Sequence, residues 1–102
     1  MIYELVWHSE AEKDFDQLDK AVQKQALTQF RKLIASPELG FSLGNKAGID
    51  LTGYQKLYFF RKKYRIIYKL NISQKIVKII AIGKREDMKA YYQAIKRVGF
   101  CS

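Results

Sequence analysis

The residues best suited to chemistry in this chain are cations and phenols in its second half. Arg65 lies in the middle of a β-rich run, Tyr64–Leu70. Lys84 and Arg85 precede a helical pattern that contains Tyr91. Guanidinium and ammonium groups bind phosphate, and surrounding cations lower the pKa of a phenol. Such a set could cleave an RNA phosphodiester without a metal, by activating a 2′-hydroxyl, stabilising the phosphorane and protonating the leaving oxygen.

The period of two in a β-strand indicates which side chains accompany Arg65. Alternation groups Arg65 with Lys63, Ile67 and Lys69, opposite the more apolar set of Tyr64, Ile66, Tyr68 and Leu70. In the preceding run, alternation separates Lys56, Tyr58 and Phe60 from Gln55, Leu57 and Phe59. An arginine in such surroundings makes a defined interaction, either with a phosphate or with an acid on a neighbouring helix. The sequence leaves these two alternatives open.

Other catalytic and cofactor chemistries find little support in the sequence. The single histidine, His8, follows the first β-rich run, and a lone histidine usually has a structural or surface role. Most carboxylates fall at exposed helical positions, and Glu86 and Asp87 occupy a first helical turn, where the helix dipole favours acids. The chain has no glycine-rich phosphate loop, and Cys101 is its only cysteine. We therefore expect no disulfide, no metal and no small-molecule cofactor.

The basic charge is concentrated in one half of the chain. The 102 residues include 19 Lys and Arg against 10 Asp and Glu, a net charge of +9. Residues 51–102 hold thirteen of these cations and only two of the acids. This distribution is typical of a polyanion-binding face, because basic side chains displace the counterions of a nucleic acid. A solubilising surface is the alternative interpretation.

The first part of the chain indicates a strand followed by a helical hairpin. Ile2–Trp7 is short, β-branched and aromatic, as strands are. Ser9 followed by Glu12 matches a capping box, which predicts that a helix begins there. Apolar residues then recur at helical spacing, with Asp19 as the expected cap of a second helix, until Pro37 ends the pattern.

The remaining sequence indicates a small antiparallel sheet. Glu38–Gly53 is rich in glycine and weakly periodic, so we expect an ordered surface loop. Three β-rich runs with short polar links favour a β-meander: Tyr54–Phe60, Tyr64–Leu70 and Ile76–Ile82. Glu86–Val98 has helical spacing. We predict one α+β domain over residues 1–102, with an N-terminal strand, a helical hairpin, a meander and a C-terminal helix, the helices packing on one face. With neither a signal-peptide pattern nor a membrane-spanning stretch, we expect a soluble cytoplasmic protein with no membrane contact.

Two stretches of the chain resemble the RelE/ParE superfamily of bacterial type II toxins, specifically its RelE branch. They are Tyr64–Tyr68 and Ile82–Glu86, the second continuing through Tyr91, Ala94, Lys96 and Arg97. The resemblance covers nearly the whole chain in element order and implies the RelE-like toxin fold. It also implies an mRNA interferase, an endoribonuclease that depends on the ribosome and cuts mRNA in the A site without a metal. The implied partners are a cognate antitoxin that neutralises the protein, the ribosome and mRNA.

The resemblance further implies roles for individual residues. Arg65 would stabilise the scissile phosphate, and Lys56 falls where the family has a cationic residue on a strand. Arg85 would act on the phosphate or as the general acid at the leaving oxygen. Tyr91 would be the candidate general base. We assign the remaining cations of this region to RNA or phosphate binding: Arg61, Lys62, Lys63 and Lys84.

One position departs from the family pattern. Tyr58 stands where the family has a second lysine, two residues after the first. Lys63 or Lys84 could compensate for this lysine. The general base accordingly stays open between Tyr91, the adjacent Tyr92 and a lysine.

Two other functions stay open as alternatives. A ParE-like toxin would bind and poison DNA gyrase and would have no need of a nuclease site, so the presence of Arg65, Arg85 and Tyr91 argues against it. An inactive toxin-fold module would bind an antitoxin without cleaving RNA. We expect the antitoxin to contribute an acidic segment that folds on the cationic surface, with an affinity that weakens as salt increases.

Overall fold

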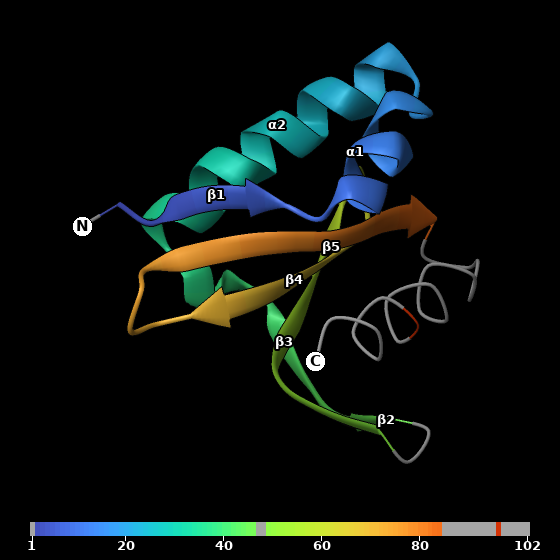
Figure 1. The fold of residues 1–102 in the computed structure, drawn as a ribbon. Helices are drawn as coiled ribbons and strands as arrows, with labels where there is room; N and C mark the ends of the chain where they lie inside the picture. Colours follow the sequence, from blue (N-terminus) through green and yellow to red (C-terminus); the bar gives the residue numbers. More distant parts are fainter. Residues whose placement is uncertain (1, 47–48, 85–95, 97–102) are drawn as a thin grey trace.

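The structure, a computed structural model, describes residues 2–46, 49–84 and Lys96 (Figure 1). In chain order the elements are β1 (Glu4–Trp7), α1 (Ser9–Asp16), α2 (Lys20–Ala35), the 3₁₀ helix η1 (Pro37–Leu39), β2 (Phe41–Lys46), β3 (Ile49–Phe59), β4 (Tyr64–Asn71) and β5 (Ile76–Lys84). The helix expected over Glu86–Val98 lies, apart from Lys96, outside the described residues. No helix in the described ranges is long and apolar enough to span a membrane.

The five strands form one mixed sheet in the order β1-β5-β4-β3-β2 (Figure 1). β3, β4 and β5 are consecutive antiparallel neighbours, which confirms the predicted meander. β1 pairs in parallel with β5, so the N-terminal strand lies beside the last strand of the sheet. A parallel pair requires a crossover connection, and the helical hairpin forms the first part of the long connection between these two strands. The α+β class predicted from the sequence is confirmed.

The prediction of a surface loop over Glu38–Gly53 is wrong. Most of this segment forms β2 and the first part of β3, which pair in antiparallel fashion. The glycines lower the local strand propensity, but the backbone ladder with the neighbouring strand stabilises the extended conformation. The register shifts between Ser42 and Gly44, and such an irregularity also obscures the period of two. Gly53 has φ +90°, a conformation that favours glycine.

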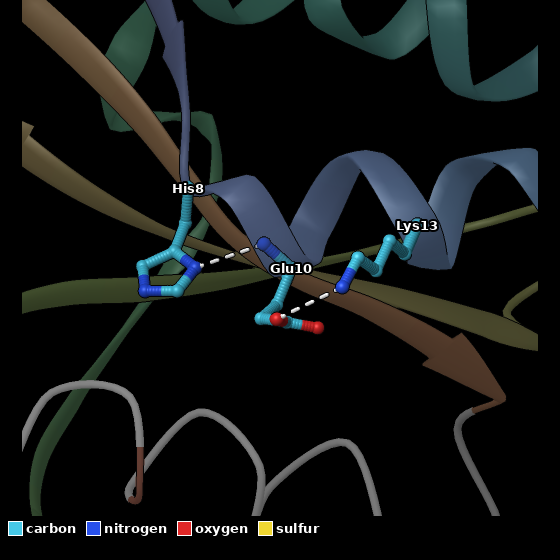
Figure 2. Close-up of polar contacts among 3 residues, drawn as sticks. All are labelled: His8, Glu10 and Lys13. Atoms are coloured by element: carbon cyan, nitrogen blue, oxygen red, sulfur yellow. Dashed lines mark hydrogen bonds and ion pairs between the residues drawn. The ribbon is translucent and has the colours of Figure 1, made fainter.

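The first helix begins at Ser9 as predicted, but a different residue caps it. His8 is the N-cap, and its Nδ1 accepts the backbone N–H of Glu10 at 3.1 Å (Figure 2). Figure 2 also shows the ion pair of Lys13 with Glu10, one turn apart on the helix. The Nζ–Oε1 distance is 3.3 Å. The predicted capping box of Ser9 and Glu12 is therefore wrong, because Ser9 already has helical geometry. Asp19 is the N-cap of α2 as expected, without a capping hydrogen bond from its side chain.

The two helices of the hairpin, α1 and α2, pack on the same face of the sheet (Figure 1), which is the part of the one-face prediction that the described residues test. Trp7 lies between Phe15 of α1 and Phe30 of α2, with ring centroids at 5.5 and 5.0 Å in edge-to-face geometry. The buried sheet residues of this core are Phe59, Ile66, Tyr68, Val77, Ile79 and Ile82. A smaller apolar cluster on the other face contains Leu43, Ile67, Ile80 and Ala81, with Tyr54 packed against it. We call the side of this smaller cluster the open face, a label that means only that neither of the two described α-helices, α1 and α2, covers it.

Asp14 joins α1 to the sheet. The pairing of β1 with β5 ends at Trp7 and Ile79, and Ile82 lies three residues further along β5. The N–H of Ile82 donates to Asp14 Oδ2 at 3.1 Å. The helix thus supplies the acceptor that a longer β1 would have supplied.

Candidate functional site

Arg65 is the charged residue buried most deeply in the described part of the chain, with 3% of its surface exposed. On β4 it pairs with Tyr58 of β3 on one side and with Gly83 of β5 on the other. Residues directly opposite one another in a sheet project from the same face. Because Ile66 and Tyr68 belong to the helix-covered core, Arg65 lies on the open face. The alternation expected from the sequence is confirmed here.

Lys56 shares the open face with Arg65. It pairs with Ile67, the residue two positions after Arg65 on β4. Its ammonium group lies 5.5 Å from the centroid of the Tyr58 ring, a cation–π distance. Lys56, Tyr58 and Arg65 therefore form one continuous group across β3 and β4, and the phenol lies between two cations along the sheet surface.

A buried apolar cluster adjoins this group. Ile67, Ile80 and Ala81 are nearly fully buried on the same face. Apolar surroundings lower the effective dielectric, so a charge there interacts more strongly with a bound anion than it would in water. Lys56, Tyr58 and Arg65 are suited to bind a phosphate and to stabilise additional negative charge on it.

The other predicted phosphate-binding cations lie apart from Arg65 and Lys56, at the β3–β4 turn. Arg61, Lys62, Lys63 and Lys84 line a hollow between the β3–β4 turn and the start of α2. Its other lining residues are Asp19, Ala21, Val22, Phe60 and Tyr64. We call this feature the turn hollow. Tyr64 packs against the helix-covered core and pairs with Lys84, which places Lys84 on the opposite face of the sheet from Arg65.

The turn that carries three of these cations has an unusual backbone. Phe60, Arg61 and Lys62 have φ values of 52°, 57° and 62°, and the N–H of Lys63 donates to the carbonyl of Phe60 at 3.1 Å. These values lie in the left-handed region, which residues with a β-carbon seldom occupy. Lys63 lies in this turn and not in β4, so strand alternation does not place it with Arg65.

Three candidates from the sequence analysis are not located by the structure. Arg85, Tyr91 and Tyr92 lie outside the described residues. β5 ends at Lys84, and its Gly83 lies directly beside Arg65.

His8 has a structural role at the start of α1. The His8 imidazole caps α1, which agrees with the structural interpretation of the lone histidine. Within the described ranges, no group of three or more His, Cys, Asp or Glu side chains is arranged to hold a metal ion.

The sequence analysis missed the role of Tyr68 in holding the segment before β2. Its hydroxyl lies 2.8 Å from the carbonyl of Pro37, 2.6 Å from Gln55 Oε1 and 3.0 Å from the backbone N–H of Gly40, which donates to it. A β-carbon at Gly40 would lie 2.5 Å from this hydroxyl and 2.6 Å from the carbonyl of Lys56. Burial raises the pKa of Tyr68, the hydrogen bond from Gly40 lowers it, and the charge of Glu38 raises it, with a net upward shift. The only local signal was Gly40 itself, because a glycine permits a close approach.

A comparison with family models identifies the type of protein. Residues 5–88 match the model of the ParE toxin of the type II toxin–antitoxin system parDE. The chain belongs to this toxin family. It is therefore a type II toxin of the RelE/ParE superfamily, as the resemblance implied.

Curated relatives of this toxin carry the RelE name. A putative RelE-like toxin protein of Escherichia coli is 27% identical over 101 residues, which cover 96% of this chain and 99% of that protein. The mRNA interferase toxin RelE of E. coli K12 is 28% identical over 101 residues, with the same coverage.

Solved structures share the fold of this toxin. A double arginine-to-alanine mutant of E. coli RelE in the free state has a TM-score of 0.76 at 24% identity, over 96% of this chain and 99% of that one. The toxin chain of the RelBE2 toxin–antitoxin complex of Mycobacterium tuberculosis has a TM-score of 0.67 at 22% identity, over 83% of this chain and all of that one. The RelE-like fold expected from the resemblance is confirmed.

Proposed function

We propose that this toxin is an endoribonuclease that cleaves mRNA in the A site of the ribosome, without a catalytic metal. The observation that supports this proposal best is the buried Arg65 beside Lys56 on the open face. A guanidinium held in apolar surroundings can stabilise the extra negative charge of a phosphorane. The relatives named as mRNA interferases support the same activity. Because ribosomes lie in the cytoplasm, we propose that the toxin acts there.

The proposed chemistry divides the three steps among the assigned residues. Arg65 and Lys56 would hold the scissile phosphate and stabilise the phosphorane. Following the resemblance, Tyr91 would take the proton of the 2′-hydroxyl, and Arg85 would act on the phosphate or protonate the leaving oxygen. Tyr58, which replaces the second family lysine, would contribute its phenol beside both open-face cations.

We also propose a cognate antitoxin as partner. Solved structures of RelE toxins include complexes with RelB antitoxins, among them an E. coli RelE mutant bound to an antitoxin peptide. The cations of residues 51–102 favour an acidic partner segment that orders on binding.

Cleavage on programmed ribosomes tests the proposal. Toxin freed of metal with EDTA and then desalted is added to 70S ribosomes with a defined A-site codon, and mRNA ends are mapped by primer extension. Arg65→Gln should reduce the cleavage rate by roughly 100-fold or more, because it removes a charged donor to the transition state. Lys56→Gln, Arg85→Ala and Tyr91→Phe should also reduce it strongly. Lys24→Gln, an exposed lysine of α2, is the matched control and should cleave as the wild type does.

The match to the ParE model keeps DNA gyrase as a second candidate target. A gyrase poison would inhibit supercoiling in purified gyrase reactions and would leave A-site mRNA intact. An inactive module would fold and bind its antitoxin without either effect. If folded wild-type toxin cleaves no mRNA on the ribosome, the proposed function is rejected, and the gyrase reaction then separates the two alternatives.

A further inference from the structure

The turn hollow combines cations with aromatic surface on the helix-covered side of the sheet. Its volume is about 720 Å³, within the range of clefts that bind small ligands, which is about 300–1,000 Å³. It is open to solvent along the exposed Arg61, Lys62 and Lys63, and Ala21 and Val22 of α2 contribute aliphatic surface to its wall. A site of this composition can accept a ligand that has both an anionic and a flat apolar part.

The charges of the turn hollow favour an anion. Three consecutive cations occupy the turn, and Lys84 joins them from the end of β5. Among the described lining residues Asp19 is the one carboxylate, and none of the four cations forms an ion pair with another described residue. Like charges gathered in this way repel one another, and a bound phosphate relieves the repulsion.

The aromatic rings of the turn hollow offer a stacking surface. The centroids of Phe60 and Tyr64 are 5.9 Å apart, with their planes at 80° to each other. Both side chains are half-buried, so part of each ring faces the hollow. Aromatic rings next to a cationic groove are a recurrent means of binding unstacked bases in single-stranded nucleic acid.

The left-handed backbone of Phe60, Arg61 and Lys62 fixes this arrangement at an energetic cost. None of the three is glycine or asparagine, the residues that occupy such a turn most readily. The turn instead places an aromatic ring and two long cationic side chains where smaller residues would be more stable. We interpret this energetic cost as a sign that the turn has a binding function.

We propose that the turn hollow binds one nucleotide of single-stranded RNA, with its base against the ring of Phe60 or Tyr64 and its phosphate between Lys63 and Lys84. This inference rests on the proposed function only in that RNA is the polyanion the toxin handles. The nucleotide is not the one cleaved, because Lys84 and Arg65 lie on opposite faces of the sheet. An RNA strand whose scissile phosphate lies on the open face would pass the ends of β4 and β5 to reach the turn hollow.

Binding of an uncleavable RNA tests this inference. The probe is a fluorescein-labelled decamer of 2′-O-methyl uridine, whose blocked 2′-oxygen prevents cleavage, and its binding is followed by fluorescence anisotropy in about 50 mM salt. In a second measurement, tripolyphosphate competes with the decamer for the site. Tripolyphosphate has the negative charge of a phosphate chain but no base. The variants are Lys63→Gln/Lys84→Gln and Phe60→Leu, with Lys24→Gln/Lys32→Gln as the charge-matched control on exposed positions of α2 outside the hollow.

The inference predicts a separate effect for each part of the nucleotide. Lys63→Gln/Lys84→Gln should weaken binding of the decamer roughly tenfold, against less than about twofold for the control. Phe60→Leu should weaken binding of the decamer roughly fivefold and leave competition by tripolyphosphate unchanged. Equal losses in the two double variants would overturn the site. The nucleotide assignment would be overturned if Phe60→Leu weakened the binding of the decamer and of tripolyphosphate to the same extent. It would also be overturned if the turn hollow bound an acidic peptide and no RNA.

This test and the test of the proposed function fail independently. Binding of the decamer requires no cleavage, so a toxin that binds RNA in the turn hollow and leaves A-site mRNA intact rejects the proposed function alone. Conversely, suppose that A-site cleavage depends on Arg65 but that Lys63→Gln/Lys84→Gln binds the decamer as the wild type does. This result rejects nucleotide binding in the turn hollow and leaves the proposed function standing.

Discussion

At the scale of single residues, the Tyr68 hydroxyl makes a prediction about stability. Tyr68→Phe removes the acceptor of the Gly40 N–H and the contacts to Pro37 and Gln55. Leaving such buried polar groups without a partner costs about 1–3 kcal/mol each, and rearrangement reduces the total, so we expect a loss of about 1–3 kcal/mol in the free energy of unfolding. Urea denaturation at neutral pH measures it. Tyr3→Phe is the control, and an equal change in both variants would contradict the prediction.

Tyr68 also predicts how stability depends on alkaline pH. Burial raises its pKa in the folded protein above that in the unfolded chain, which is about 10. Above that pH the unfolded chain releases the proton while the folded protein retains it, so stability falls as pH rises. The stability that the protonated Tyr68 hydroxyl contributes is therefore fully present below a pH of about 10. Urea denaturation as a function of pH should show a flatter alkaline decline for Tyr68→Phe than for the wild type, and parallel profiles would refute the assignment.

The residue scale also shows what the sequence could and could not predict. The face of Arg65 follows from strand alternation, which depends only on neighbouring residues and was predicted correctly. The contacts of Tyr68 with Pro37 and Gly40 join residues 31 and 28 positions apart, so no local pattern could reveal them. The sequence analysis offered Lys84 as a replacement for the lysine absent at Tyr58, but Lys84 pairs with Tyr64 and therefore lies on the opposite face of the sheet, which only the strand register could reveal.

At the scale of elements, a substitution in the β4–β5 turn should stabilise the fold. Lys75 has φ 57°, and its carbonyl accepts the N–H of Glu4 at 2.8 Å, so this turn also holds the start of β1. A left-handed residue with a β-carbon costs about 1–2 kcal/mol, hence Lys75→Gly should raise the free energy of unfolding by about 1 kcal/mol. Thermal denaturation measures the gain. Ser73→Gly, in the same turn, is the control and should give no increase, and a lower melting temperature for Lys75→Gly would contradict the prediction.

The link between α1 and β5 gives a second prediction for elements. Asp14→Ala removes the acceptor of the Ile82 N–H and should cost about 1–3 kcal/mol, because β1, on the side of β5 away from β4, pairs only as far as Ile79 and offers no carbonyl to replace it. Asp14→Asn keeps a carbonyl oxygen at the same place and should retain most of the stability. Chemical denaturation of the two variants tests this, and equal losses would show that the negative charge, and not the hydrogen bond, is what matters.

Element prediction succeeded where the signal was local and failed where pairing supplied the stability. β4 and β5 have strong β propensity and short links, and their predicted bounds agree closely with the structure. β2 is poor in β-branched residues and contains Gly44, and it is a strand because it pairs with β3. The capping residue of α1 was also missed: the side chain of His8 accepts the N–H of Glu10, whereas the predicted capping box would have joined the Ser9 side chain to the N–H of Glu12.

At the scale of the whole molecule, the uneven charge predicts how the toxin recognises its antitoxin. The cations of residues 51–102 are spread over several elements, including β3, β4, the turn between them and β5, so a partner must cover a broad positive surface. An acidic segment that orders on this surface gains affinity from long-range attraction, which salt screens. The dissociation constant should therefore increase at least tenfold from about 50 mM to about 500 mM salt, mainly through slower association. Surface plasmon resonance with the cognate antitoxin measures both rates. An affinity that stays constant over this range would instead indicate an apolar interface, and Lys24→Gln/Lys32→Gln would show whether the charge of α2 contributes to the effect.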